Sequence, residues 1–402
     1  MIERAVAALG AGPLTEAGIA AHVAPLFSRV LERRRSAIDL ANHSLGRPPD
    51  ATAADVAEAV ALWQTRLGDA WDQWSVEMEA YRSRLARLLG ALRADCIVPK
   101  TSAGQGLRAI LNSYVTVPRV VATRGEFDSI DVILRQYARL GRIALTFVES
   151  RGDGLFAEED LLAATGDGAD LLVVSQVVFN SGQILPALPA LVEATHAHGG
   201  RVLLDVYHSA GVFPVDLDAL DVDFAVGGSY KYLRGGPGAC YLYLHPRHLD
   251  GSLATLDIGW FAKREPFRYE RPDPIALAEG GDAFLESTPP ILTWYQARAG
   301  QLFTLAIGVA RLREYSLAQQ KRLVSLLAKR GVEAEGGSED RGAFIVVRDR
   351  DASALAQALE RTGIHGDARG AYLRLCPDVL TTDAELIAAA EQVARARNDL
   401  RP

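Results

Sequence analysis

The chain has 402 residues, more than one compact core usually contains, so two domains are expected. Hydrophobic residues make up 49% and charged residues 23%, and the net charge of −7 gives no support to binding of nucleic acid or an anionic membrane. Three cysteines without a CxxC pair, an N-terminus without a long apolar block, and the lack of an apolar run of ~20 residues predict a soluble cytoplasmic protein.

The first strong pattern runs from Val56 to Leu88. Apolar residues recur there at spacings of three and four, which predicts a long amphipathic helix, or two helices end to end. Its tryptophans, among them Trp63 and Trp71, are interpreted as core or interface residues.

After Cys96, short apolar runs alternate with helical patterns. The runs are continuous in Val, Leu and Ile, as in strands covered on both faces, so we expect a mostly parallel sheet with helices on both sides. In such sheets ligands bind outside the carboxyl ends of the strands. Expected strands are 119–123, 142–148, 170–179, 201–206 and 223–227, and expected helices are 129–141, 156–165 and 188–199.

A smaller α+β unit follows the sheet. Residues from about Leu292 to Leu317 predict one long helix leaving the first domain. Beyond it we expect a helix at 316–331, strands at 343–349 and 371–376, and helices at 352–363 and 383–396. The predicted organisation is an N-terminal segment (1–50) packed near the small domain and the active site, a large α/β domain (51–291) and a small C-terminal α+β domain (292–402).

Three features are predicted to meet at the carboxyl edge of the sheet. Asp205 ends one strand, and Lys231 follows the next. Ala103, Gly104 and Gln105 stand where a helix begins, and their backbone amides form an expected anion site. A carboxylate and an amine at buried strand ends are costly unless they meet partners.

Pyridoxal phosphate needs this combination. Lys231 is the expected Schiff-base amine, Asp205 the partner of the pyridinium nitrogen, and Phe127 the ring that stacks on the cofactor. Each feature alone has a common structural reading: a strand-end Asp often caps a turn, small-residue loops are frequent, and a lone His208 is more often a structural donor. Their coincidence on one edge favours the cofactor site.

The block from Leu203 to Pro246, "LLDVYHSAGVFPVDLDALDVDFAVGGSYKYLRGGPGACYLYLHP", resembles the cofactor-lysine region of kynureninases. The segments "LANHSLGRPP", "IVPKTSAGQGLRAIL", "EFDSID", "IGWFAK", "STPPIL" and "YLRLCP" match that family in the same order. The resemblance covers nearly the whole chain and implies an α/β fold of fold-type I, in the class V branch of pyridoxal-phosphate enzymes.

The resemblance also implies roles for individual residues. Lys231 binds the cofactor and moves protons at the substrate Cα, Asp205 holds the pyridinium nitrogen, and Tyr230 is a proton donor. Arg374 grips the substrate α-carboxylate, and Ser44 lies in the loop that matches the family's "NSLG". The implied cofactor neighbours are Ala103, Gly104, Ser129 and Tyr230 around the phosphate, Phe127, Ser175 and His208 around the ring, and Trp260 and Thr288 from the partner subunit of a homodimer.

Three positions depart from the family's pattern. Tyr207 stands where the family has alanine, Lys263 where it has histidine, and Thr288 where it has asparagine. These departures indicate a relative of the family whose substrate-binding residues have diverged. We count Tyr207 and Lys263 among the expected substrate-binding residues, and Lys263 would suit a carboxylate on the substrate side chain.

The function implied by the resemblance is hydrolytic Cβ–Cγ cleavage of L-kynurenine, or of a related 2-amino-4-oxo acid, to L-alanine plus an acid. The alternative is a class V relative with another outcome on a different amino acid: an aminotransferase, a racemase or epimerase, a β-lyase or a desulfurase. A desulfurase needs a mobile cysteine, whereas Cys240 and Cys376 lie in apolar strand segments. A non-catalytic sensor fused to a DNA-binding module is disfavoured because Lys231 and Asp205 are present and no helix-turn-helix precedes Leu40. No metal site is expected.

Overall fold

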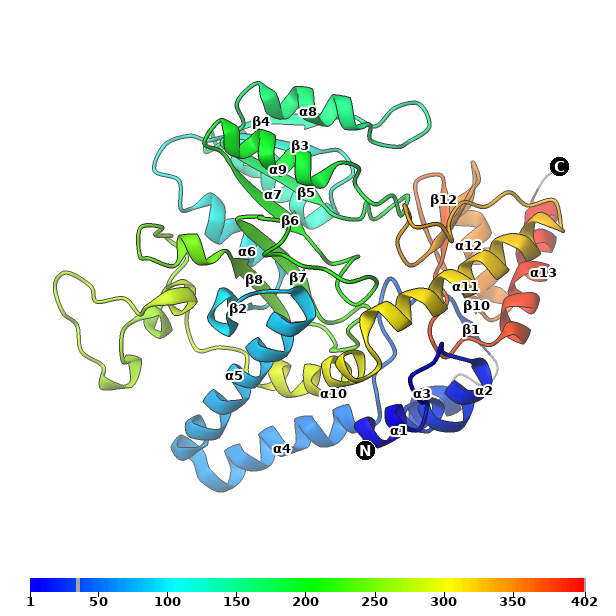
Figure 1. The fold of residues 1–402 in the computed structure, drawn as a ribbon, viewed down its shortest axis with the longest axis horizontal. Coiled ribbons are helices and arrows are strands. Elements are labelled where there is room, and N and C mark those ends of the chain that lie inside the picture. Colours follow the sequence, from blue (N-terminus) through cyan, green and yellow to red (C-terminus); the bar gives the residue numbers. More distant parts are fainter. Residues whose placement is uncertain (34–36, 401–402) are drawn as a thin grey trace.

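A seven-stranded sheet forms the centre of the large domain (Figure 1). The computed structural model describes residues 1–33 and 37–400. Neighbouring strands run parallel except in the two pairs that contain β8, so the sheet is mixed and mostly parallel, as predicted. In spatial order its strands are β2 (Ile97–Lys100), β8 (Cys240–Leu244), β7 (Phe224–Gly228), β6 (Arg201–Asp205), β5 (Leu171–Ser175), β3 (Arg119–Thr123) and β4 (Ala144–Val148).

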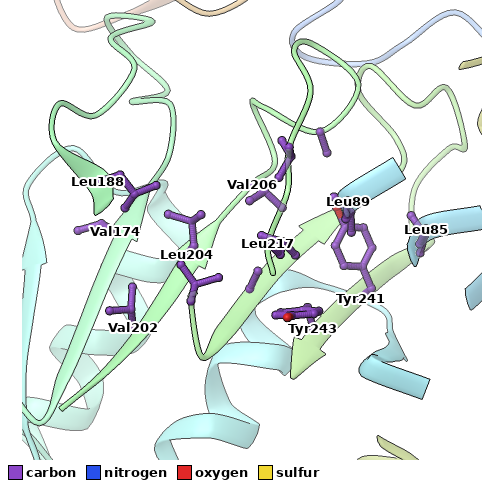
Figure 2. Close-up of a cluster of buried hydrophobic side chains, with 14 of the residues drawn as sticks. Leu85, Leu89, Val174, Leu188, Val202, Leu204, Val206, Leu217, Tyr241 and Tyr243 are labelled. Carbon is purple, nitrogen blue, oxygen red and sulfur yellow. The ribbon is translucent and has the colours of Figure 1, made fainter. Parts of the chain in front are cut away.

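Helices cover both faces of this sheet, because alternate residues of its buried strands point to opposite sides. On one face Val174 and Leu204 pack with Leu85 and Tyr241 (Figure 2). On the other face Leu203 belongs to a second apolar cluster. The first face is covered by α5 (Ala70–Leu89), α8 (Glu158–Gly166), α9 (Leu188–Ala197) and α10 (Ile291–Ile307), and the second by α6 (Ala103–Leu111) and α7 (Asp128–Arg139).

Two predicted long helices are interrupted. The pattern from Val56 to Leu88 forms two helices end to end, α4 (Ala51–Arg66) and α5, joined by a single turn at Leu67–Asp69. The single helix expected from Leu292 to Leu317 is wrong, because α10 ends at Ile307 and α11 runs on from Val309 to Ala328. Gly308 has φ +90°, a conformation that stops a helix, while the apolar periodicity continues across it.

The small domain contains a three-stranded antiparallel sheet in the order β11 (Asp367–Arg369), β12 (Tyr372–Leu375) and β9 (Ile345–Arg348). Its core packs α11, α12 (Ala352–Arg361) and α13 (Asp383–Asp399) against β9 and β12. Strand β11 was not predicted. Also unpredicted is a short parallel pair, β1 (Ile38–Asp39) with β10 (Ile364–His365), which joins the N-terminal segment to this domain.

The remaining N-terminal helices are α1 (Ile2–Ala7), α2 (Glu16–Gly18) and α3 (Ser28–Arg33). Apolar residues of this segment, including Phe27, pack against Phe303 of α10. Across the part of the chain that the structure describes, no helix is both long and apolar enough to cross a membrane.

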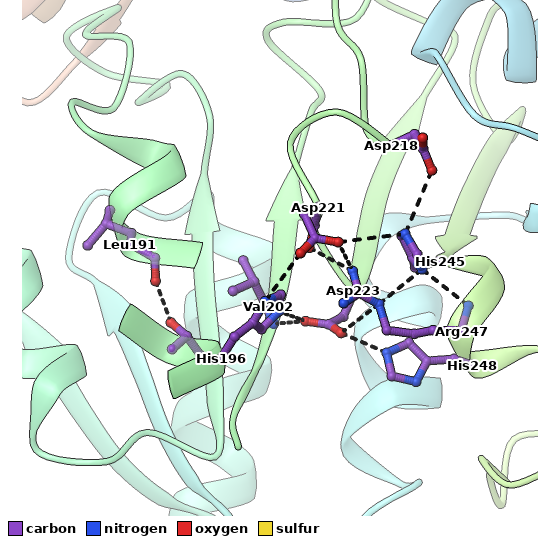
Figure 3. Close-up of polar contacts among 10 residues, drawn as sticks. Leu191, His196, Val202, Asp218, Asp221, Asp223, His245, Arg247 and His248 are labelled. Carbon is purple, nitrogen blue, oxygen red and sulfur yellow. Dashed lines mark hydrogen bonds and ion pairs between the residues drawn. The ribbon is translucent and has the colours of Figure 1, made fainter. Parts of the chain in front are cut away.

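A polar cluster closes the amino end of the sheet, away from the strand ends predicted to bind ligand (Figure 3). Buried Asp223, just before β7, accepts hydrogen bonds from the Val202 amide (2.8 Å), His196 Nε2 (2.8 Å) and His248 Nε2 (2.7 Å). Burial alone raises the pKa of Asp223, but these donors together lower it below its ordinary value. The cluster therefore ties β6, β7, α9 and the segment after β8 together through one ionised carboxylate.

Candidate active site

A cavity of about 340 Å³ opens at the carboxyl ends of β5, β6 and β7. Its walls come from the sheet edge, the start of α6 and the N-terminal segment. Ten of the residues predicted from sequence line it: Ser44, Ala103, Phe127, Ser129, Ser175, Asp205, Tyr207, His208, Tyr230 and Lys231. Because the carboxyl ends of neighbouring parallel strands meet at one edge of the sheet, side chains that are far apart in the sequence lie together here.

Lys231 lies in the turn that follows β7 and is only 5% exposed. Its Nζ lies 2.7 Å from His208 Nε2, and the rings of Phe127, Tyr207 and Tyr230 surround it at 5.3–5.6 Å from Nζ to ring centroid. Burial lowers the pKa of Lys231 to about 7, against the opposing effect of Asp205. Near neutral pH a large share of this amine is therefore unprotonated and nucleophilic.

A glycine lets the N-terminal segment close over this turn. The Gly46 amide donates to the Tyr230 carbonyl at 2.8 Å. A Cβ at Gly46 would lie 1.9 Å from the Lys231 carbonyl oxygen, so any larger residue would force the backbones apart. The "NSLG"-like loop is thereby seated directly on the lysine turn.

Asp205 ends β6 and is likewise 5% exposed. Its Oδ1 accepts a hydrogen bond from the Tyr207 amide at 2.8 Å. Within residues 1–33 and 37–400 no side-chain cation pairs with it, and burial raises its pKa to about 6. A buried carboxylate facing a cavity without a cation is a site for a protonated ring nitrogen or another cationic group.

His208 connects Lys231 to a further buried side chain. Burial lowers its pKa well below the ordinary value, and the charge of Lys231 acts in the same direction, so the imidazole is neutral. Its Nδ1 lies 3.1 Å from the Tyr232 hydroxyl. An imidazole that accepts from Lys231 at Nε2 carries its proton on Nδ1 and donates it to Tyr232.

The start of α6 is the predicted anion site, and its backbone amides differ in whether they have acceptors. Ser102 caps the helix, because its Oγ accepts from the Gln105 amide at 3.1 Å. The amides of Ala103 and Gly104 have no acceptor among the described residues, and Ala103 lines the cavity. Gln105 differs from the expectation: its amide is bound to Ser102 and its side chain to Thr101 and Glu286.

Tyr207, one of the predicted substrate-binding residues, forms part of the cavity wall. Its hydroxyl lies 2.8 Å from Cys240 Sγ, and its ring lies 5.4 Å from that of Tyr230. Gly228 makes room for it, since a Cβ there would lie 2.4 Å from the Tyr207 hydroxyl. The phenol is thus held against β7 and β8.

Sequence reasoning missed Glu126, a buried acid that contacts the cavity residue Ser175. Its carboxylate accepts hydrogen bonds from the hydroxyls of Thr123 and Ser175, both at 2.6 Å. Burial raises its pKa to about 7, and the charge of Asp205 acts in the same direction. A glutamate in the loop "TRGEFDSID" looks solvent-exposed in sequence; its position beside Phe127 was the available signal.

Replacing Glu126 with glutamine is expected to remove a pH dependence of stability. The folded-state pKa lies above the unfolded value, so the wild-type contribution is complete below about pH 4.5 and is lost as pH rises through 7. The wild type should therefore lose up to about 3 kcal/mol of unfolding free energy relative to Glu126→Gln across this range. Urea unfolding of both proteins at pH 5 and pH 8 measures this change. A difference in unfolding free energy between wild type and Glu126→Gln that is the same at both pH values would contradict the prediction.

Besides Gly104 and Gln105, four predicted residues lie outside the cavity walls. Arg374 is buried beneath them, bound to Asp367 and to the Phe179 carbonyl. The Trp260 indole donates to the Thr288 hydroxyl at 3.3 Å. Trp260 and Lys263 line a separate cavity of about 460 Å³. Within one chain, therefore, Trp260, Lys263 and Thr288 do not join the Lys231 cavity.

Comparison with known proteins decides the family. The aminotransferase class-V family model matches residues 60–371. Kynureninase from Salinispora tropica is 30% identical over 366 residues, covering 84% of each chain. The chain belongs to the aminotransferase class-V family, in its kynureninase branch. Kynureninases from Bacillus cereus (27% over 390 residues, 92% of this chain and 90% of the relative) and Deinococcus radiodurans (28% over 361 residues, 85% and 84%) agree.

Solved structures share the fold of this class-V chain. A mutant of the protein C-DES, with glycine linked to its PLP cofactor, has a TM-score of 0.81 at 19% identity and covers 92% of this chain and 98% of its own. The cysteine desulfurase of Thermococcus onnurineus NA1 has a TM-score of 0.78 at 19% identity, with 91% and 96% covered. The predicted fold-type I architecture is confirmed.

Pyridoxal phosphate is the cofactor of this class-V enzyme, as predicted. The cavity fits it, because Asp205 is a buried carboxylate without a cation and the α6 amides of Ala103 and Gly104 face no acceptor among the described residues. When bound, this cofactor withdraws electrons from the Cα of an amino acid. Lys231 would hold its carbonyl carbon, Asp205 its ring nitrogen, and the start of α6 its phosphate.

Proposed function

We propose that the protein is a kynureninase-type hydrolase that cleaves the Cβ–Cγ bond of L-kynurenine, or of a related 2-amino-4-oxo acid, to L-alanine and an acid. The observation that carries the proposal is the pairing of Lys231 and Asp205 in one cavity of a chain whose relatives are kynureninases across 84–92% of its length.

The residues around the cavity suit the proton transfers of this reaction. Lys231, with a pKa of about 7, can take a proton from the substrate Cα and return it near neutral pH. Burial raises the pKa of Tyr230 to about 12, so its hydroxyl keeps a proton that it can donate to the carbon released from the γ-carbonyl. Arg374 is the proposed partner of the α-carboxylate.

A homodimer would complete the site. Trp260, Lys263 and Thr288 lie away from their own chain's cavity, and the exposed Thr288 can be reached by a second subunit. We propose that they serve the partner's cavity. A strictly monomeric, active enzyme in light scattering would contradict this arrangement.

The competing class-V outcomes differ in what else they need. A desulfurase that passes sulfur to a cysteine needs a reactive thiol, but all three cysteines are buried. Burial raises the thiol pKa of Cys240 to about 11 and that of Cys376 well above its usual range. Aminotransferase, racemase and β-lyase reactions need no such thiol and remain outcomes of the test.

Mass spectrometry of the products tests the proposal. The cofactor-loaded protein is incubated with L-kynurenine and 3-hydroxykynurenine, with a Lys231→Ala variant as control. Alanine together with anthranilate or its hydroxylated form, absent from the control, is the expected result. A keto acid, a racemised amino acid or no reaction would reject kynureninase chemistry in favour of another outcome on another amino acid.

A further inference from the structure

Arg374 is already bound by a carboxylate of its own chain. In the antiparallel pair of β11 and β12, Asp367 stands directly opposite Arg374. Asp367 Oδ1 accepts from Arg374 Nε at 2.7 Å, and Oδ2 accepts from Nη2 at 2.5 Å. This is the side-on bidentate geometry with which an arginine grips a free carboxylate.

The pair is placed next to the cavity. Arg374 is only 3% exposed, and its Nη1 donates to the carbonyl of Phe179, a residue of the cavity wall. The charge of Arg374 contributes to the lowered pKa values of Lys231 and His208, so its field reaches the reacting groups. A substrate carboxylate in the cavity would therefore approach a guanidinium whose bidentate edge is occupied.

Asp367 is also held from its other side. His43 Nε2 donates to Asp367 Oδ1 at 2.7 Å. Burial alone raises the pKa of Asp367, but the hydrogen bonds from His43 and Arg374 more than reverse this, so the carboxylate stays ionised. His43 is fully buried, and the next two residues, Ser44 and Leu45, line the cavity. Three hydrogen-bond donors thus hold the internal carboxylate beside the cavity, and Arg369 Nη2 lies 3.5 Å from its Oδ2.

We propose that Asp367 is a specificity-determining residue: as an internal carboxylate it competes with the substrate α-carboxylate for Arg374 and weakens the binding of amino acids. The inference rests on the proposed function in one respect, the assignment of Arg374 to the α-carboxylate. Its consequence is a site that holds simple amino acids loosely, including the alanine product, and relies on the remaining part of the substrate for affinity.

The test compares binding of L-alanine and L-alaninamide to the cofactor-loaded wild type and an Asp367→Asn variant, by absorbance titration. Asparagine carries no charge and has only one side-chain oxygen that can accept a hydrogen bond from the guanidinium. The bidentate pair with Arg374 is therefore lost. L-Alanine should bind about tenfold or more tightly to the variant, whereas L-alaninamide, which has no carboxylate, should bind equally to both proteins.

Asp383→Asn is the matched control, because Asp383 forms a bidentate pair with Arg322 in the same domain and neither residue lines the cavity. It should leave alanine binding unchanged. Should Asp367→Asn fold poorly, His43→Ala removes one of the three donors to Asp367 while Arg374 keeps its counter-charge, and a smaller gain in alanine affinity is expected.

Unchanged or weaker alanine binding in a folded Asp367→Asn protein would overturn the proposal and make Asp367 a residue that merely positions Arg374. A failure of the proposed function can be told apart from a failure of this proposal about Asp367. No turnover is involved in the titration, so a protein that never cleaves kynurenine still gives an answer, and alanine binding that survives Arg374→Ala would reject Arg374 itself as the carboxylate site.

Discussion

Replacing Lys231 with alanine is expected to lower product formation on the order of 10⁴-fold, because in the proposed function this residue supplies both the amine that binds the cofactor and the base at the substrate Cα. No other lysine can take its place at the strand end, since Lys100 is bound to Glu286 and the Phe284 carbonyl. Steady-state rates measure the loss of product formation, and the mass of the borohydride-reduced protein measures the loss of covalently held cofactor.

Lys329→Ala is the control for this experiment, because Lys329 is exposed in the small domain. It should retain both the rate and the covalent label of the wild type. A label that persists on Lys231→Ala protein, mapped to Lys100 or Lys263, would show that the cofactor is held elsewhere and would reject the cavity as the active site.

Replacing Asp205 with asparagine is expected to lower the turnover number on the order of 10³-fold while the protein stays folded. The amide oxygen can still accept from the Tyr207 amide, but the charge that stabilises a protonated ring nitrogen is gone. Asp205 is also the largest influence that raises the pKa of Lys231, so this pKa should fall below about 7. The pH dependence of the rate at which an amine-selective reagent labels Lys231 in the cofactor-free protein measures that shift.

Asp223→Asn is the matched control for Asp205, because it removes another buried carboxylate from the opposite end of the same sheet (Figure 3). It should lower the free energy of unfolding yet leave the turnover number of the folded protein close to that of the wild type. Equal losses of turnover in both variants would mean that Asp205 acts through stability alone.

Much of the large domain was predictable because its central strands and their ends can be predicted from short stretches of the sequence. The central strands β5 and β6 are nearly continuous apolar runs, and the strand-end rule then predicts that Asp205 and Lys231 lie at the same edge of the sheet. The break at Gly308 was missed because periodicity describes a helical face and not the φ of one residue. A single glycine in a helical pattern is often tolerated, so sequence alone does not locate the stop.

The unpredicted parts of the site depend on contacts between distant segments. His43 meets Asp367 across 324 positions, and Asp367 meets Arg374 only because β11, a three-residue strand, pairs with β12. Neither segment carries a periodic signal long enough to predict its partner. Glu126 was missed for the same reason, since its burial comes from Ser175 on a different strand.

The N-terminal segment acts as a short mechanical tether between the small domain and the lysine turn. At one end β1 is hydrogen-bonded to β10, and at the other Gly46 is bonded to the Tyr230 carbonyl. The few residues between Asp39 and Gly46 reach at most about 25 Å when fully extended, so they offer little slack. The position of the small domain and that of the backbone beside Lys231 are therefore linked through one short segment of chain.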